Sequence, residues 1–230
     1  MEPILISTRV TEERSYAEKR SSLAYEYVVL FLELGYLPVP VPANAVSAGR
    51  ASVPAGSADD AAAGSADQTV AGYFDLEPAA LVLTGGNTVD PTLFGGDDQR
   101  AAAIREGLSG VYPERDETEH ALIAGALSRG IPVLGICRGL QTINCYFGGR
   151  MSYNFKGHVG VEHQLVSERP ELSSEETNSY HNDVVTGPEL APPLRSLAHT
   201  PDGVIEALYH PEEPVLALQW HPDRQRKEFD

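Results

Sequence analysis

The chain of 230 residues carries 33 acidic against 17 basic side chains, a formal charge of −16, and 42% of its residues are hydrophobic. This length can bury a sizeable core in a single domain, and the strong negative charge repels nucleic acid and anionic membranes, so we expect neither as a partner. The first residues lack the charged, apolar and small-residue regions of a signal peptide, and no apolar run approaches the roughly 20 residues that span a bilayer, so we expect a cytoplasmic protein.

In chain order, the first predicted elements are a strand, a helix and a second strand. Residues 3–7 ("PILIS") predict a buried strand, and 24–35 a helix that ends at Gly35, because the residue after a helix often needs a positive φ. Residues 37–42 ("LPVPVP") predict a strand that its prolines confine to a sheet edge. The next segment, 43–72, is rich in Ala, Ser, Gly and Asp with few large apolar side chains, so we expect a surface insertion or flexible loop.

The alternation of strands and helices resumes after this insertion. Residues 79–86 ("AALVLTGG") predict a buried strand that runs into two glycines, and 116–130 predict an amphipathic helix capped at Asp116. Another apolar strand, 131–136, leads into a helix over 139–149. Almost wholly apolar strands separated by helices are typical of a mainly parallel α/β sheet covered on both faces, which binds ligands beyond the carboxyl ends of its strands.

From about residue 151 onward, short strands and turns replace the helices. The strand candidates are "EHQLVS", "DVVTG", "VIEALYH" and "PVLALQWHP", at 162–167, 183–187, 204–210 and 214–222. This half predicts short mixed or antiparallel strands that return to the sheet. The sequence shows no internal repeat, and we interpret residues 1–230 as a single domain.

A cysteine stands where the 131–136 strand gives way to the following helix. Cys137 lies between Gly135 and Gly139, and flanking glycines permit the strained turn that exposes a nucleophile at the top of a sheet. The helix start favours a thiolate and aims the amide of Arg138 at the atom that the sulfur attacks, which offers an oxyanion site. Most cysteines are small core residues instead, and Cys145, which lacks such glycines, keeps that interpretation.

A thiol nucleophile needs a base, and the base needs a group that orients it. His221 ends another apolar run, "VLALQWH", and Asp223 follows two residues later. Cys137, His221 and Asp223 are therefore a catalytic triad in outline. His181, in "NSYHNDVV", is the competing base.

Neither a metal site nor a disulfide is predicted. His158 and His163 are five residues apart, and no third ligand follows at a matching spacing. The two cysteines lie eight residues apart in one predicted helical region, which indicates reduced thiols.

Four segments together carry a resemblance to a known family. "VLTGGNTVDP", "GIPVLGICRGLQTIN", "NSYHNDVV" and "LALQWHPD" resemble the class I glutamine amidotransferase-like superfamily and, within it, the γ-glutamyl hydrolase branch that includes γ-glutamyl-γ-aminobutyrate hydrolases. The resemblance runs in order through nearly the whole chain and leaves out 43–72. It implies a flavodoxin-like three-layer α/β sandwich, and hydrolysis of a small γ-glutamyl compound through a glutamyl thioester, which releases glutamate and an amine without any cofactor.

The same resemblance implies roles for individual residues. By motif position, Cys137 is the nucleophile and His221 the base. Asp223 stands where the family most often has glutamate, one methylene longer, so the reach of this carboxylate is the least secure part of the triad. Gly86 would supply a second oxyanion amide alongside that of Arg138. The glutamyl group of the substrate would be held by Gln141 and by the backbone around Ser179, Tyr180 and His181.

The N-terminal stretch "ISTRVTEERSYAEKRSSLAYEY" resembles a sub-branch associated with γ-glutamyl-CDP-amidate hydrolysis. Guanidinium groups bind phosphate in a bidentate manner, so a phosphorylated leaving group could meet the basic residues of this stretch, Arg9, Arg14, Lys19 and Arg20. An equally weighted interpretation is a solvated loop that brings some positive charge to an acidic protein.

Three functions stay open at this stage. A free-standing γ-glutamyl hydrolase, which could be a homodimer, is the leading one. A glutaminase subunit that delivers ammonia to a separate synthetase is the second, and it would need that partner. A non-catalytic regulatory relative is the third, and the complete Cys137, His221 and Asp223 set argues against it.

Overall fold

The computed structural model describes residues 1–51, 69–94, 107–169 and 176–224. The chain divides into two compact units. Unit 1 comprises Met1–Asp90 and Ser109–Val133, and unit 2 comprises Pro91–Leu108 and Leu134–Asp230. Within the described residues, no helix is both long enough and apolar enough to cross a membrane.

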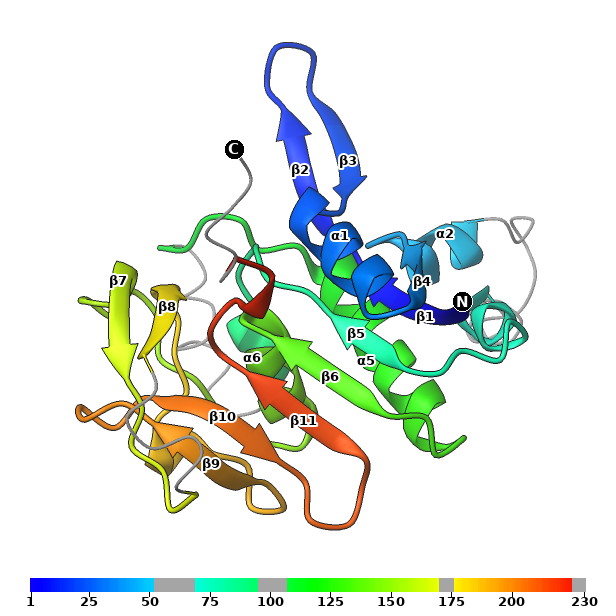
Figure 1. The fold of residues 1–230 in the computed structure, drawn as a ribbon. Helices are drawn as coiled ribbons and strands as arrows, with labels where there is room; N and C mark the ends of the chain where they lie inside the picture. The colour runs from blue at the N-terminus through cyan, green and yellow to red at the C-terminus, as the bar shows by residue number, and fades with distance from the viewer. Residues whose placement is uncertain (52–68, 95–106, 170–175, 225–230) are drawn as a thin grey trace. The chain divides into compact units, whose positions relative to one another are not determined.

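Unit 1 contains three parallel strands in the order β4–β1–β5 (Figure 1). The middle strand, β1 (Glu2–Ser7), pairs along its whole length with β4 (Tyr36–Val41) and on its other side with β5 (Leu81–Leu83). Among the described strands β4 pairs only with β1, so its prolines lie at an edge where a missing amide is tolerated. The predicted parallel arrangement is confirmed, and the centre of β1 is buried at Ile4, Leu5 and Ile6.

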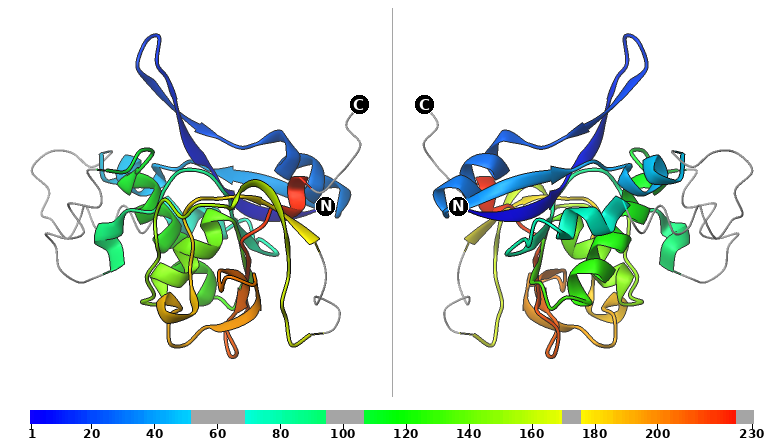
Figure 2. Two further views of the ribbon diagram at one scale, coloured as in Figure 1. Left: turned by 90° about the vertical axis from the view of Figure 1, so that its left-hand side faces the viewer. Right: turned by 90° about the vertical axis from the view of Figure 1, so that its right-hand side faces the viewer.

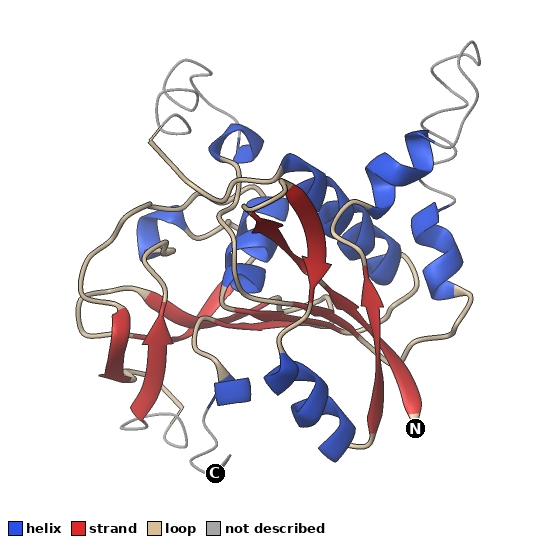
Figure 3. Ribbon diagram, turned by 90° about the horizontal axis from the view of Figure 1, so that it is seen from above, coloured by secondary structure: helices blue, strands red, loops and turns tan. Residues whose placement is uncertain are grey.

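Helices cover both faces of these three strands. Helix α1 (Tyr25–Glu33) lies on one face and α5 (Pro113–Leu127) on the other, as Figures 1 and 3 show. Helix α1 ends as its sequence predicts, with Gly35 at a φ of 88°. This layering confirms the predicted α/β class.

The predicted helix cap at Asp116 is wrong, because helix α5 begins three residues earlier. Pro113 is its first residue, because the ring of proline presets a helical φ and its missing amide costs nothing there. Asp116 therefore lies inside the helix, where it is buried and its carboxylate accepts a hydrogen bond from the backbone amide of Asp90 at 3.2 Å.

The two described ends of the 43–72 segment are helical. Helix α2 (Ala45–Ala51) opens it, and a second helix spans 69–74. Val46 and Val70 are buried, and α2 packs against α5. These ends thus belong to the core although their composition predicts a surface loop, because alanines and single valines suffice between closely packed helices. The middle of the segment lies outside the described residues.

The basic N-terminal stretch forms a β-hairpin that the sequence analysis did not predict. Strands β2 (Arg9–Glu13) and β3 (Glu18–Ser22) pair in antiparallel fashion and project past the sheet of unit 1 (Figure 2). Their polar side chains pair across the strands, as in the 2.6 Å hydrogen bond between the hydroxyls of Thr11 and Ser22. Such strands carry no apolar alternation, which is why their sequence gives no strand signal.

Unit 2 is built on strands in the order β6–β11–β10–β9 (Figure 1). Strand β6 (Val133–Ile136), whose first residue belongs to unit 1, leads into helix α6 (Arg138–Tyr146). Strands β9 (Arg195–His199), β10 (Ile205–Tyr209) and β11 (Val215–Leu218) follow, and β10 pairs antiparallel with both of its neighbours. The predicted antiparallel strands of this half are confirmed.

A second antiparallel pair, β7 (Val159–Gln164) and β8 (Glu176–Tyr180), completes unit 2. The predicted strand at 183–187 is wrong, because only isolated bridges form there, at Val184 and Thr186. Three short 3₁₀ turns also occur in the described part of the unit: η1 (Pro91–Phe94), η2 (Gly187–Glu189) and η3 (Pro222–Arg224).

Candidate active site

Cys137 occupies a strained turn between β6 and α6. Its φ of 55° and ψ of −107° lie in a region that residues other than glycine rarely adopt, at a cost of about 1–3 kcal/mol. Two backbone hydrogen bonds hold it there: its amide donates to the carbonyl of Leu218 at 2.7 Å, and its carbonyl accepts from the amide of Leu140 at 3.0 Å. The predicted elbow is therefore present, and it is fastened to the end of β11.

Close contact between Gly135 and Gly139 explains why glycines flank the cysteine. A Cβ added to Gly135 would lie 2.7 Å from the backbone of Gly139 and equally close to the side chain of Ile143. The end of β6 and the first turn of α6 thus meet backbone to backbone. Only glycine at position 135 permits this approach.

His221 is held by its neighbours through both its ring and its backbone. Its Nδ1 lies 3.1 Å from Oδ1 of Asp223, which is buried in the short turn η3. Its backbone amide donates to Oδ1 of Asn178 at 2.9 Å, and Nδ2 of Asn178 donates to its carbonyl at 2.8 Å. The shorter carboxylate of Asp223 therefore reaches the imidazole, and with Nδ1 engaged by this carboxylate, Nε2 is left for other contacts.

The imidazole of His221 favours its charged form. Burial alone would lower its pKa, but hydrogen bonds with Asp223 and with the thiol of Cys137 outweigh burial and raise the pKa of His221 to about 9. A protonated imidazole beside a thiol stabilises the thiolate and is also a proton donor for a leaving amine. His221, rather than His181, thus has the partners that a catalytic base requires.

The backbone amide of Arg138 lies at the start of α6, whereas its side chain is buried. The first amides of a helix have no acceptor within that helix, and the amide of Arg138 is the first of α6. The residue is 1% exposed, and its guanidinium donates to the hydroxyl of Thr142 at 3.2 Å. Gln141 is also buried, and its Nε2 donates to the carbonyl of Asp183 at 2.7 Å.

The three candidates on and after β8 face in different directions, because side chains alternate along a strand. Ser179 is buried and donates to the carbonyl of His158 at 2.5 Å. His181 is buried as well, with its ring 5.2 Å from that of His158. Tyr180 is 46% exposed, and its ring packs edge-on at 6.0 Å from that of His221. Of these three residues, Tyr180 is thus the one whose side chain packs against the candidate base His221.

Gly86 belongs to a loop of unit 1 whose carbonyls are held by a single buried guanidinium. Arg115 donates to the carbonyls of Gly86 and Thr84 and forms a buried ion pair with Glu119 at 2.9 Å. Gly86 itself has a φ of 81°, which disfavours any other residue. Sequence reasoning missed Arg115, although a charged pair four residues apart in an otherwise partly apolar helix was a signal for a buried bridge.

Arg9 packs directly on Gly86. Its Cδ lies 2.9 Å from the position that a Cβ of Gly86 would take, and its buried Nε has no hydrogen-bond partner among the described residues. Two other cations of this stretch differ, since Lys19 pairs with Glu114 at 3.1 Å and Arg20 pairs with Glu18 at 2.6 Å. Unlike these two, Arg9 has a buried polar atom without a partner among the described residues.

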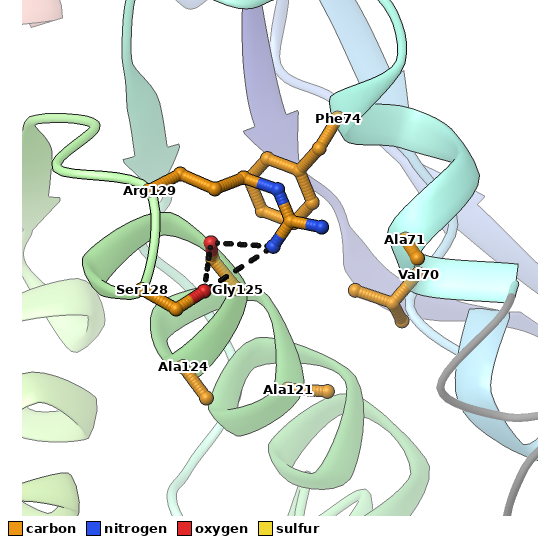
Figure 4. Close-up of a pocket in the computed structure, with 8 residues that line it drawn as sticks. All are labelled: Val70, Ala71, Phe74, Ala121, Ala124, Gly125, Ser128 and Arg129. Atoms are coloured by element: carbon orange, nitrogen blue, oxygen red, sulfur yellow. Dashed lines mark hydrogen bonds between the residues drawn. The ribbon is translucent and has the colours of Figure 1, made fainter.

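A pocket of about 360 Å³ lies elsewhere in unit 1, between the 69–74 helix and α5 (Figure 4). Its floor is mostly apolar, and the guanidinium of Arg129 stacks on the ring of Phe74 at 4.7 Å. Phe74 in turn fills the space that a side chain at Gly125 would need. None of the predicted site residues lines this pocket.

Comparison with known proteins places this geometry in a family. The sequence model of the family Peptidase C26 matches residues 65–223. A γ-glutamyl-γ-aminobutyrate hydrolase from Escherichia coli O157:H7 is 32% identical over 143 residues, which cover 51% of this chain and 56% of that protein. A γ-glutamyl-CDP-amidate hydrolase from Campylobacter jejuni is 34% identical over 112 residues, which cover 49% of this chain and 52% of that protein.

Among solved structures, a glutamine amidotransferase from Thermotoga maritima is similar in fold. It aligns with 96% of this chain and 76% of its own, at a TM-score of 0.55 and 15% identity. The chain spans about half to two thirds of the length of the curated relatives it matches. Since the family model covers more than half of the sequence, from before the elbow to the end of the His-Pro-Asp turn, the chain belongs to the Peptidase C26 family.

Proposed function

We propose that this chain hydrolyses the γ-glutamyl amide bond of a small molecule, with Cys137 as nucleophile, His221 as proton carrier and Asp223 as the group that orients His221. The strained Cys137 is held by its amide to Leu218 at the end of β11, and three residues further on the imidazole of His221 is hydrogen-bonded to the buried carboxylate of Asp223; this arrangement carries the proposal. The names of the relatives from Escherichia coli and Campylobacter jejuni support the γ-glutamyl substrate class.

Acylation would proceed through attack of the Cys137 thiolate on the γ-carbonyl carbon. The carbonyl oxygen becomes an oxyanion, which the backbone amide of Arg138, at the start of α6, stabilises by a hydrogen bond. When the intermediate collapses, the carbon–nitrogen bond breaks and the His221 imidazolium gives its proton to the leaving amine. The products of this half-reaction are the free amine and a glutamyl thioester on Cys137.

Deacylation would reverse these roles with water in place of the amine. The neutral imidazole of His221 takes a proton from water, whose oxygen attacks the thioester carbon. The carbon–sulfur bond then breaks, glutamate leaves, and the thiolate–imidazolium pair is restored. Asp223 keeps Nδ1 protonated throughout, so that Nε2 handles both proton transfers.

We propose that the remaining residues of the site also have roles in this reaction. Gly86 would donate a second hydrogen bond to the oxyanion, and the guanidinium of Arg115 would keep that loop in shape through its carbonyls. Tyr180 would contact the glutamyl group through its exposed side chain. Gln141 would contribute by holding the carbonyl of Asp183 with its buried side chain, and Ser179 and His181 through the backbone that their hydrogen bonds to the carbonyl of His158 hold in place.

We propose further that the leaving amine carries an anionic group, which Arg9 binds. The half-buried Arg9 has an unpartnered Nε next to Gly86, whereas Lys19 and Arg20 are engaged in ion pairs. γ-Aminobutyrate carries a carboxylate and CDP-amidate carries phosphates, so the substrates in the names of both relatives have such a group. A guanidinium suits either anion.

The decisive experiment measures glutamate release from a panel of glutamine, γ-glutamyl-γ-aminobutyrate, γ-glutamyl-putrescine, folyl-γ-glutamates and a γ-glutamyl phosphoramidate. Cys137→Ala is the blank, and Cys145→Ala is the matched control because Cys145 is a buried helix residue away from the elbow. We expect one anionic γ-glutamyl amine to turn over far faster than glutamine, with the blank inactive.

Two outcomes would contradict this proposal. Release of glutamate at the same rate from the Cys137→Ala variant would exclude the thioester route. If no member of the panel reacts while Cys137 still alkylates readily, the free-standing hydrolase is wrong. A glutaminase that works only with a separate synthetase would then be the function to pursue.

A further inference from the structure

Three histidines and one glutamate come together in unit 2, and the reaction proposed above does not use their side chains. His158, His163, His181 and Glu206 each place one nitrogen or oxygen atom so that these atoms lie within 4.8 Å of one another. His158, His181 and Glu206 are 1%, 3% and 0% exposed, and His163 is half-buried. His158 precedes β7, His163 lies on β7, His181 follows β8 and Glu206 lies on β10.

The polar atoms of this cluster are not satisfied by the described protein groups. His181 Nε2 and Glu206 Oε1 are 3.4 Å apart, which is close enough for an ion pair but is not a hydrogen bond. The buried atoms without a hydrogen-bond partner in the described structure are Nδ1 of His158, Nε2 of His163, both ring nitrogens of His181 and both carboxylate oxygens of Glu206. Buried polar atoms almost always have partners, so six orphans in one place indicate a missing ligand.

The carboxylate of Asp202 orients the ring of His158. Its Nε2 lies 3.1 Å from a carboxylate oxygen of Asp202, whose other oxygen accepts a hydrogen bond from the hydroxyl of Thr200. This carboxylate keeps the proton on Nε2 and leaves the lone pair on Nδ1, the nitrogen that has no partner. Metal-binding histidines are typically oriented by such a carboxylate on the far nitrogen.

We propose that His158, His163, His181 and Glu206 bind a divalent transition-metal ion, with zinc as the best match. Three imidazoles and one carboxylate form a four-coordinate donor set of the kind that zinc accepts, whereas magnesium and calcium prefer oxygen alone. Tetrahedral bonds of about 2.1 Å place donors about 3.4 Å apart, so a cluster within 4.8 Å needs only a modest contraction. The positive ion would also compensate the buried charge of Glu206.

The role of the ion is structural. It would tie β10 to the β7–β8 pair, and β8 carries Asn178, which holds the backbone of His221 on both sides. A bound metal would therefore steady the strand that positions the candidate base, without contact with the reacting atoms. The site differs from the proposed triad and does not depend on the proposed hydrolysis.

The test uses the full chain, without an affinity tag, after dialysis against a chelator. The apo-protein is titrated with Zn²⁺ followed by calorimetry and with Co²⁺ followed by visible absorption, because four-coordinate Co²⁺ has intense d–d bands. We expect one equivalent of each ion to bind, Zn²⁺ to raise the melting temperature, and His163→Gln to weaken the affinity about tenfold or more. His163 is chosen because it is only half-buried, so its variant should fold.

His210→Asn is the matched control. Nδ1 of His210 accepts hydrogen bonds from the amides of Glu212 and Glu213, which an asparagine oxygen can replace, and His210 is not part of the cluster. This variant should bind metal like the parent protein. Glu206→Gln should also lose affinity, and its melting temperature without metal reports whether it folds. The proposal is wrong if the apo-protein binds neither ion, or if His163→Gln and the parent bind both ions equally.

Discussion

The side chain of Asn178 forms hydrogen bonds with both backbone polar groups of His221, at 2.8 and 2.9 Å. An asparagine amide has one donor and one acceptor side by side, so it satisfies a backbone segment in the way a neighbouring strand would. Tyr180, two residues further along β8, packs its ring against the imidazole on the same side of the strand. One short strand therefore holds both the backbone and the ring of the candidate base.

Asn178→Ala is expected to lower both stability and activity. The loss of both hydrogen bonds leaves a partly buried amide and carbonyl without partners, which should cost about 2 kcal/mol of unfolding free energy. The less well-held imidazole should reduce kcat/KM about tenfold or more. Urea unfolding and glutamate release measure the two effects. Asn182→Ala, at an exposed position, is the control and should change neither. Unchanged kcat/KM in Asn178→Ala would show that Asn178 does not position the base.

The raised pKa of His221 predicts a loss of stability at alkaline pH. A group whose pKa is higher in the folded state stabilises the protein fully below the unfolded value, and this stabilisation is lost as the pH rises through the folded value. For His221 that range runs from 6.5 to about 9, and the free energy of unfolding should fall by about 3 kcal/mol across it. Urea unfolding at a series of pH values measures this slope.

Asp223→Asn is the variant that tests the cause of this slope. It removes the leading interaction that raises the pKa of His221, whereas burial, which lowers this pKa, remains. The slope between these pH values should become much shallower, and kcat should fall by about two to four orders of magnitude because the imidazole loses its orienting carboxylate. An equally steep slope in this variant would mean that groups other than the His221–Asp223 pair produce it.

Gly135→Ala is expected to damage the elbow. Its Cβ would lie 2.7 Å from the backbone of Gly139, and neither backbone can move without opening the turn at Cys137. We expect a loss of about 1–3 kcal/mol in unfolding free energy and a large loss of kcat. Gly72→Ala is the control, because no atom of the described residues lies within 4 Å of its added Cβ and the residue is helical. That change should be neutral or slightly stabilising. A fully active Gly135→Ala would show that the close approach is not required.

Arg9→Gln should change substrate preference rather than chemistry. γ-Aminobutyrate and putrescine are amines of similar length, but the first ends in a carboxylate and the second in an ammonium group. If Arg9 binds the anion, the variant should raise KM for γ-glutamyl-γ-aminobutyrate about tenfold, or about 1.4 kcal/mol, and leave γ-glutamyl-putrescine unaffected or improved. Arg20→Gln, which removes an exposed ion pair, should leave both values alone. Equal losses on both substrates would assign Arg9 a purely structural role.

Much of the fold was predictable from local sequence patterns. Strands such as 3–7 and 131–136 are continuous apolar runs between turn residues, and their parallel, helix-covered arrangement follows from burial on both faces. The elbow was also predictable from a local pattern, because Gly135, Cys137 and Gly139 are close in the sequence. The β2–β3 hairpin was not, because its polar strands are held by backbone pairing and cross-strand contacts that leave no periodic signal.

The sequence by itself determined the family, the α/β class and the neighbourhood of the candidate nucleophile, since each depends on residues within a few positions of one another. Only the tertiary structure decided which distant groups surround those residues. Asn178 meets His221 across 43 positions, and the spacing of His158 and His163 gave no hint that His181 and Glu206 would join them. Ligands and supporting hydrogen bonds are chosen by distance in space, and strand order and crossovers bring such residues together without any constraint on their separation in the chain.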